Sequence, residues 1–159
     1  MKEIETYIQN YLGIGGRDLS AVSDLFLNKT VQKNKFLLKT DQYAQSMSFI
    51  KSGYFRVFAL NGDGSKEITQ WISTKGMFVT ELSSFLFGTP SRFNIQALSN
   101  CELYTISKED WKRIGNYIPN WAEIEKLFIA KCFVTLENRV FNQLSMTAEE
   151  KVRHLLAMN

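Results

Sequence analysis

The fold of this chain is decided by residues 76–107, GMFVTELSSFLFGTPSRFNIQALSNCELYTIS. A short apolar run opens the stretch, a segment long enough for one helical turn follows, and glycine and proline then supply a turn. Apolar and polar residues alternate in the remainder, as in half-buried strands. We expect, in order, a strand, a one-turn helix, a turn and two strands, over residues 77–79, 81–85, 88–91, 93–97 and 103–106.

The one-turn helix predicted at residues 81–85 is a candidate anion site. The first backbone N–H groups of a helix have no partner within the helix, and the helix dipole makes this end positive. A negatively charged group is therefore stabilised in front of such a helix start. The sequence predicts a ligand-binding segment here.

Residues 76–107 resemble the phosphate-binding cassette in the catabolite-activator (Crp) and Fnr family of bacterial transcription regulators. The resemblance runs through this stretch without a gap, on Gly76, Phe78, Glu81, Leu82, Phe85, Gly88, Ala97, Cys101, Glu102, Ile106 and Ser107. It implies a cyclic-nucleotide-binding β-barrel, a long dimerisation helix and a C-terminal winged helix-turn-helix domain. The expected fold class is mainly β with flanking helices, a double-stranded β-helix (jelly roll).

Three cassette positions depart from the family pattern. Thr80 and Ser83 stand where the family has glycine, and Ser91 stands where it has the arginine that clamps the cyclic phosphate. Arg92 comes one residue late, and a shift of one residue in a strand turns a side chain to the opposite face. Losing a forked, charged contact weakens binding. We therefore expect a cyclic nucleotide or another small anionic effector, without assigning cyclic AMP.

The candidate effector-binding residues come from the cassette and from one position on the long helix. The backbone N–H groups of residues 82–84 are expected to hold the anion, and a serine or arginine of the following loop is expected to meet it. By the resemblance, a glutamate accepts from a sugar hydroxyl and a polar residue of the long helix reaches the purine. The candidates are Glu81, Leu82, Ser83, Ser84, Ser91, Arg92 and Thr135. An isolated threonine in a helix also commonly bonds back to its own turn.

The whole chain divides into three predicted parts. Residues 1–118 form the β-barrel domain with its N-terminal helices, the second of which is expected to end near Asn28. Residues 119–146 form the dimerisation helix. Residues 147–159 begin a truncated helix-turn-helix domain, since Thr147 and Glu150 make a capping box before a short apolar face.

The long helix, from about Trp121 to about Leu144, carries apolar residues on two faces. Ile124, Phe128 and Cys132 form a stripe that could pack on the barrel. Ile129, Phe133, Leu136 and Val140 recur at alternating spacings of four and three residues, as in a coiled-coil seam. This seam predicts a parallel homodimer. The alternative is one wide stripe packed on its own domain.

The sequence lacks the residues that several classes of protein would need. His154, the single histidine, follows the long helix, and the two cysteines, Cys101 and Cys132, have no metal-binding spacing. We therefore expect no enzyme, no haem and no iron–sulfur cluster. The start has no signal-peptide pattern and no run reaches membrane-spanning length, so we expect a cytoplasmic protein without a membrane partner. The net charge of +3 is compatible with DNA nearby but does not argue for it.

Two other functions remain open at this point. One is a stand-alone cyclic-nucleotide-binding regulatory module, for which we expect a monomer. The other is a ligand-free structural dimer that serves as a scaffold for a DNA-binding domain.

Overall fold

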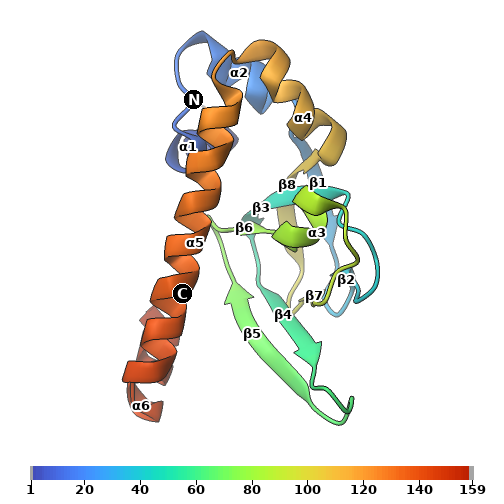
Figure 1. Ribbon diagram of the computed structural model, residues 1–159, viewed down its shortest axis with the longest axis vertical. Helices are drawn as coiled ribbons and strands as arrows, with labels where there is room; N and C mark the ends of the chain where they lie inside the picture. The colour runs from blue at the N-terminus through green and yellow to red at the C-terminus, as the bar shows by residue number, and fades with distance from the viewer. Residues whose placement is uncertain (1, 158–159) are drawn as a thin grey trace.

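A computed structural model of the chain describes residues 2–157. Within them, two helices open the chain, a β-roll interrupted by a short helix follows, and three helices end it (Figure 1). The helices are α1 (Glu3–Leu12), α2 (Arg17–Ser23), α3 (Leu82–Phe87), α4 (Lys108–Tyr117), α5 (Trp121–Ser145) and α6 (Ala148–Ala157). The strands are β1 (Leu27–Val31), β2 (Phe36–Leu38), β3 (Ser46–Ser52), β4 (Phe55–Leu60), β5 (Glu67–Ser73), β6 (Phe78–Val79), β7 (Asn94–Ala97) and β8 (Cys101–Ser107).

The strands form two four-stranded antiparallel sheets, ordered β1-β8-β3-β6 and β2-β7-β4-β5. The chain passes repeatedly from one sheet to the other, which is the topology of a jelly roll. The fold class predicted from the sequence is confirmed. Because β6, α3 and β7 follow one another, the predicted cassette lies where the chain crosses between the sheets.

The first sheet has an apolar outer face and a partly polar inner face. Phe49 and Tyr104 lie opposite one another in the β3–β8 register, and both rings contact Tyr7 of α1 at centroid distances of 5.8 and 6.2 Å. Neighbouring residues on a strand point to opposite faces. Ser48 and Thr105 therefore face the second sheet, where their hydroxyl oxygens lie 2.8 Å apart.

The turn between β3 and β4 requires glycine at its tip. Gly53 has φ +96°, which side chains of L-residues rarely adopt. A Cβ atom there would lie 2.5 Å from the Cys101 Sγ. This close approach lets β4 begin directly beside the start of β8.

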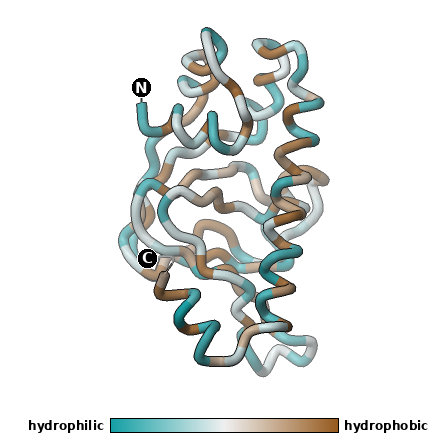
Figure 2. The backbone as a smooth tube through the Cα atoms, turned by 90° about the vertical axis from the view of Figure 1, so that its left-hand side faces the viewer, coloured by the Kyte–Doolittle hydropathy of each residue, from teal (hydrophilic) through white to brown (hydrophobic). Residues whose placement is uncertain are grey.

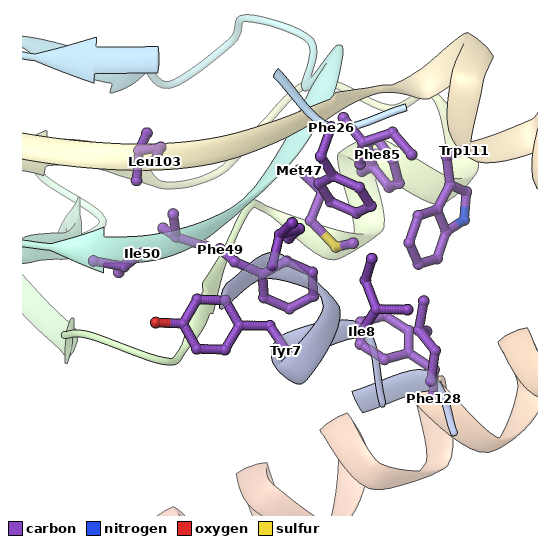
Figure 3. Packing of buried hydrophobic residues seen from close by; sticks show 14 of the residues in the cluster. Tyr7, Ile8, Phe26, Met47, Phe49, Ile50, Phe85, Leu103, Trp111 and Phe128 are labelled. Atoms are coloured by element: carbon purple, nitrogen blue, oxygen red, sulfur yellow. The ribbon is translucent and has the colours of Figure 1, made fainter. Parts of the chain in front are cut away.

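An aromatic core joins the roll to the helices (Figure 3). Phe85 of α3 contacts Trp111 of α4 at 6.0 Å between centroids, and Trp111 contacts Phe128 of α5 at 5.6 Å. The Trp111 Nε1–H donates to Glu125 Oε2 at 2.6 Å, so the indole also has a polar anchor. These contacts form continuous packing from the cassette helix to the long helix.

The two faces of α5 differ as the sequence predicted. Phe128 is 1% exposed, and Ile124 and Cys132 pack partly buried against the same core. The other stripe is open in the single chain: Ile129, Phe133, Leu136 and Val140 are 37, 61, 46 and 50% exposed. Figure 2 shows hydrophobic and hydrophilic residues interleaved along this helix.

The predicted starts of α4 and α6 are both present. The Ser107 hydroxyl accepts from the Asp110 N–H at 3.0 Å and caps α4. At α6 the Thr147 N–H donates to Glu150 Oε2, and the Glu150 N–H donates to Thr147 Oγ1. Of the segment predicted as 147–159, positions 158 and 159 lie outside the described residues.

One predicted boundary is wrong. The second helix ends at Ser23, not near Asn28. Residues 27–31 pair instead with β8, so their backbone groups bond across the sheet, and the Phe26 ring packs 5.6 Å from that of Phe49. Among residues 2–157, no helix is both long enough and apolar enough to cross a membrane.

Candidate functional site

The cassette is built around the start of α3. Glu81 is the N-cap residue, and its Oε2 accepts a hydrogen bond from the Ser84 N–H at 3.0 Å. Glu81 is 9% exposed, so its carboxylate lies at the edge of the core. Gly88 ends the helix with φ +70°, and its N–H donates to the Ser84 carbonyl. One of the helix-start donors expected to meet an anion is therefore held by the protein's own carboxylate.

Ser84 fastens α3 to the loop between β2 and β3. The side chain is fully buried, and its Oγ accepts from the Ala44 N–H at 2.9 Å. Leu82 packs partly against the core, whereas Ser83 is exposed. The four predicted residues of this turn thus lie together, with Ser83 facing solvent.

Ser91 fastens the loop before β7 to the same β2–β3 loop. Its N–H donates to the Gln42 carbonyl and its carbonyl accepts from the Asp41 N–H, each at 2.8 Å. Its hydroxyl donates to the Phe93 carbonyl at 2.8 Å and accepts from the Phe93 N–H at 3.2 Å. Ser91 is buried at 1% exposure, and all of these bonds are made within the chain.

Arg92 lies on the opposite side of this segment from Ser91. It is exposed, and the carbon of its guanidinium lies 5.4 Å from the centre of the Phe93 ring. The alternation of a buried serine and an exposed arginine agrees with the face reversal expected for a one-residue shift. None of the seven predicted effector-binding residues, Arg92 included, is among the described residues that line the roll cavity described next.

A cavity of about 550 Å³ opens inside the roll beside the cassette. Its walls include Val79 and Thr80, which immediately precede Glu81, and Ile95 of β7. Lys29 of β1 also lines it, and the β2–β3 loop supplies Gln42, Tyr43 and Gln45. None of the described residues in its walls is a carboxylate, so the cavity carries one cationic group among neutral polar and apolar ones. This composition suits a small anion.

The sequence interpretation missed Lys29 and the β2–β3 loop. The signal for Lys29 was its position two residues before the buried Val31 on a strand, which puts both side chains on one face. The loop carried no comparable signal. It reaches the site through the Ser84 and Ser91 bonds, which join segments far apart in the sequence.

Thr135 does not join the cassette. It is exposed on α5, and its Oγ1 donates to the Lys131 carbonyl one turn earlier at 2.9 Å. Among residues 2–157, no three histidine, cysteine, aspartate or glutamate side chains come together in a way that could hold a metal ion. Both cysteines are free, and burial raises the pKa of the Cys132 thiol to about 11.

Comparisons with known proteins agree with this fold. Residues 28–116 match the family model described as cyclic nucleotide-binding domain. No match is found among curated proteins.

Three solved structures illustrate the likeness in fold. The catabolite activator protein of Thermus thermophilus is 18% identical, with a TM-score of 0.69. The match covers 85% of this chain and 62% of that protein. A transcriptional regulator of the Crp/Fnr family from Eubacterium rectale is also 18% identical, with a TM-score of 0.69 over 96% of this chain and 71% of that one. The cAMP-bound regulatory domain of Toxoplasma gondii PKA is 16% identical, with a TM-score of 0.60 over 72% of this chain and 46% of that one.

Proposed function

The chain belongs to the cyclic nucleotide-binding domain family, and from that premise we propose that it is the ligand-sensing and dimerisation region of a Crp/Fnr-type transcription regulator. The proposal is carried by α5, which packs one face on the sensor domain and exposes a second apolar face. DNA binding would belong to a domain outside residues 1–159, connected through α6. No enzymatic step is assigned to these residues.

The exposed face of α5 supports a parallel homodimer. Ile129, Phe133, Leu136 and Val140 follow the spacing of a coiled-coil seam, in which each apolar residue packs into a hole on the partner helix. Burying an apolar side chain of this size contributes roughly 1.5–3 kcal/mol. These side chains are 37–61% exposed in the single chain, so pairing would recover roughly half of this value at each position, a sum comparable with the cost of association.

The proposed effector is a small anion that enters the roll cavity beside α3. The backbone of residues 82–84 and Ser91 remain the proposed anchors, and Lys29 adds a positive charge from the cavity wall. Arg92 would have to swing inward to take part, because its guanidinium lies over Phe93. The proposal therefore favours an anion smaller or differently shaped than a cyclic nucleotide. Thr135 stays a candidate contact only for a ligand that draws α5 closer.

The aromatic packing suggests how a ligand would reach the dimer seam. An anion at the helix start would compete with Glu81 for the Ser84 N–H and so shift α3. Phe85 would carry that shift through Trp111 to Phe128, which lies on the core side of α5. The ligand can move this equilibrium only by its difference in affinity for the two arrangements.

A thermal-unfolding series tests the effector site. Cyclic AMP, cyclic GMP and the smaller anions phosphate and acetate are added at millimolar concentration to the chain and to its Lys29→Ala and Arg92→Ala variants. A ligand at about 100 times its dissociation constant adds about 2.7 kcal/mol of stability, a shift of several degrees. A shift lost in Lys29→Ala supports the roll cavity, and one lost in Arg92→Ala shows that the arginine is recruited. No shift with any of these anions rejects anion sensing at this site.

The ligand-free structural dimer is the second candidate, and the cassette itself favours it. Glu81 caps its own helix, the Ser91 hydroxyl is paired with Phe93, and Arg92 is exposed. A cassette whose polar groups are satisfied within the chain has less to gain from a ligand. If the chain dimerises while no nucleotide or metabolite shifts its unfolding temperature, the ligand-free structural dimer is favoured over the ligand sensor.

A further inference from the structure

A second cavity, of about 260 Å³, lies where β5, the C-terminal half of α5 and α6 meet. In Figure 2 the chain turns at the lower end of the molecule and α6 runs back from α5 towards the C label. The cavity walls come from Thr69, Gln70, Trp71 and Ile72 on β5, from Arg139, Asn142, Gln143 and Met146 around the end of α5, and from Lys151, Val152, His154 and Leu155 on α6. It shares no lining residue with the roll cavity.

Arg139 is held in this cleft by an aromatic ring and not by an acid. The carbon of its guanidinium lies 3.6 Å from the centre of the Trp71 ring, well within the range of a cation–π contact. No carboxylate among residues 2–157 lies within ion-pair distance of it. Burial lowers the pKa of Arg139 from its ordinary value, yet an arginine remains charged at neutral pH.

Two N–H donors at this stacked pair have no partner. Arg139 Nε and Trp71 Nε1 are both shielded from solvent without a hydrogen bond to the described residues. Leaving such a donor unsatisfied costs about 1–3 kcal/mol, and more for a charged group. A small rearrangement around an acceptor in the cleft would recover part of this loss.

The remaining walls combine positive and apolar groups. Lys151 of α6 adds a second cationic group, His154 adds an imidazole, and no aspartate or glutamate is among the described lining residues. Ile72, Val152 and Leu155 supply an apolar surface. The volume is slightly below the ~300 Å³ at which most small-molecule pockets begin, so the cleft suits a molecule of small-metabolite size.

We propose that this cleft is a second ligand site, which takes a small organic anion with its charged group at Arg139 and Lys151 and its apolar body against Ile72, Val152 and Leu155. The anionic group is a carboxylate or a phosphate monoester, since both present oxygen acceptors that match a guanidinium fork. Because β5 belongs to the roll and Lys151 belongs to α6, an occupant would fasten α6 to the sensor domain. The site is independent of the cassette.

NMR of the ¹⁵N-labelled chain tests the proposal through the signal of one N–H group, the indole N–H of Trp71. The Trp71 indole N–H signal is assigned with a Trp71→Phe variant, and the signals of the buried Trp111 and Trp121 report whether the fold is intact. Benzoate, octanoate and phenyl phosphate are titrated to millimolar concentration, with benzamide as the uncharged match of benzoate. We expect at least one anion to shift the Trp71 signal saturably, and benzamide to leave it in place.

Variants separate this site from the cassette and from general apolar binding. Removing a charged partner weakens binding by about tenfold or more, so Arg139→Met should lose the response and Lys151→Met should weaken it, whereas Arg92→Ala should keep it. Arg139→Lys is the milder variant if Arg139→Met does not fold, and it should also weaken binding because it lacks the fork. The proposal is overturned if no anion shifts the signal, if benzamide shifts it equally, or if the Arg139 variants respond like the wild type.

Discussion

Replacing Glu81 by alanine removes the N-cap of α3. The variant separates the capping role of this carboxylate from its proposed role in the effector site. In the structure Glu81 Oε2 accepts from the Ser84 N–H at 3.0 Å in a nearly buried setting. An N-cap is typically worth about 1 kcal/mol, with a range of about 0.5–2 kcal/mol, and hydrogen bonds to a charged acceptor lie in the upper part of the range for such bonds. We therefore expect Glu81→Ala to lower the free energy of unfolding by about 1–2 kcal/mol.

For a chain of this length, each kcal/mol lowers the unfolding temperature by about 2–4 °C, so the expected drop is about 2–8 °C. Urea and thermal unfolding followed by circular dichroism measure it. Glu81→Gln keeps an acceptor oxygen and should lose less. Glu102→Ala is the matched control, because the Glu102 carboxylate accepts a longer bond of 3.3 Å at an exposed position and should change stability by less than about 0.5 kcal/mol.

Hydrogen exchange at the Ser84 amide gives the local readout. Without the cap this amide should exchange faster than in the wild type, whereas amides in the centre of β8 should change only with global stability. If Glu81→Ala unfolds within about 0.5 kcal/mol of the wild type and the Ser84 amide keeps its protection, the capping role is refuted. A nucleotide response that is unchanged in this variant would separately reject Glu81 as part of the effector site.

Three further changes test the rest of the molecule. Phe133→Asp places a charge in the exposed seam and should convert the proposed dimer to monomer in light scattering, whereas Asn138→Asp, outside the seam, should not; equal masses for both variants would reject the seam. Gly53→Ala should destabilise by more than about 1 kcal/mol because its Cβ would lie 2.5 Å from a β8 sulfur at φ +96°, while Gly62→Ala, with open space around it, should fold as the wild type does in a urea titration. The thiolate is the reactive form of a thiol, and a pKa raised to about 11 should slow alkylation of Cys132 at pH 8 by about a hundredfold relative to a free thiol, with reactivity rising as pH approaches 11; a rate equal to that of a free thiol would contradict this burial.

The order of strand, helix, turn and strand in residues 76–107 was predictable because local chemistry controls it. The apolar residues after Glu81 suit a short helix, Gly88 adopts the left-handed conformation that ends α3, and alternation sets the faces of β7. The two stripes of α5 were also predictable, since helical spacing alone determines which residues share a face. Such features need no knowledge of distant contacts.

The parts that the sequence did not predict depend on pairing between distant segments. The end of α2 at Ser23 follows from the pairing of residues 27–31 with β8, not from helix propensity. The β2–β3 loop joins the site only because Ala44 and Gln42 meet Ser84 and Ser91. In the same way, Trp71 and Arg139 are ordinary residues of a strand and a helix until the fold stacks them.

Both proposed ligand sites act on the same face of α5. Phe128 and Arg139 are about three helical turns apart and so lie on the same side of the helix, with the cassette packing reaching the first and the second cleft holding the other. The exposed seam, Ile129 to Val140, runs along the same length of the helix but on a different face. If ligands at the two sites favour the same placement of α5, each must raise the affinity for the other by the same factor, because the coupling free energy is reciprocal. If they favour opposite placements, each must weaken the other equally. In either case, the seam would respond to the sum of two local packing changes and not to one effector alone.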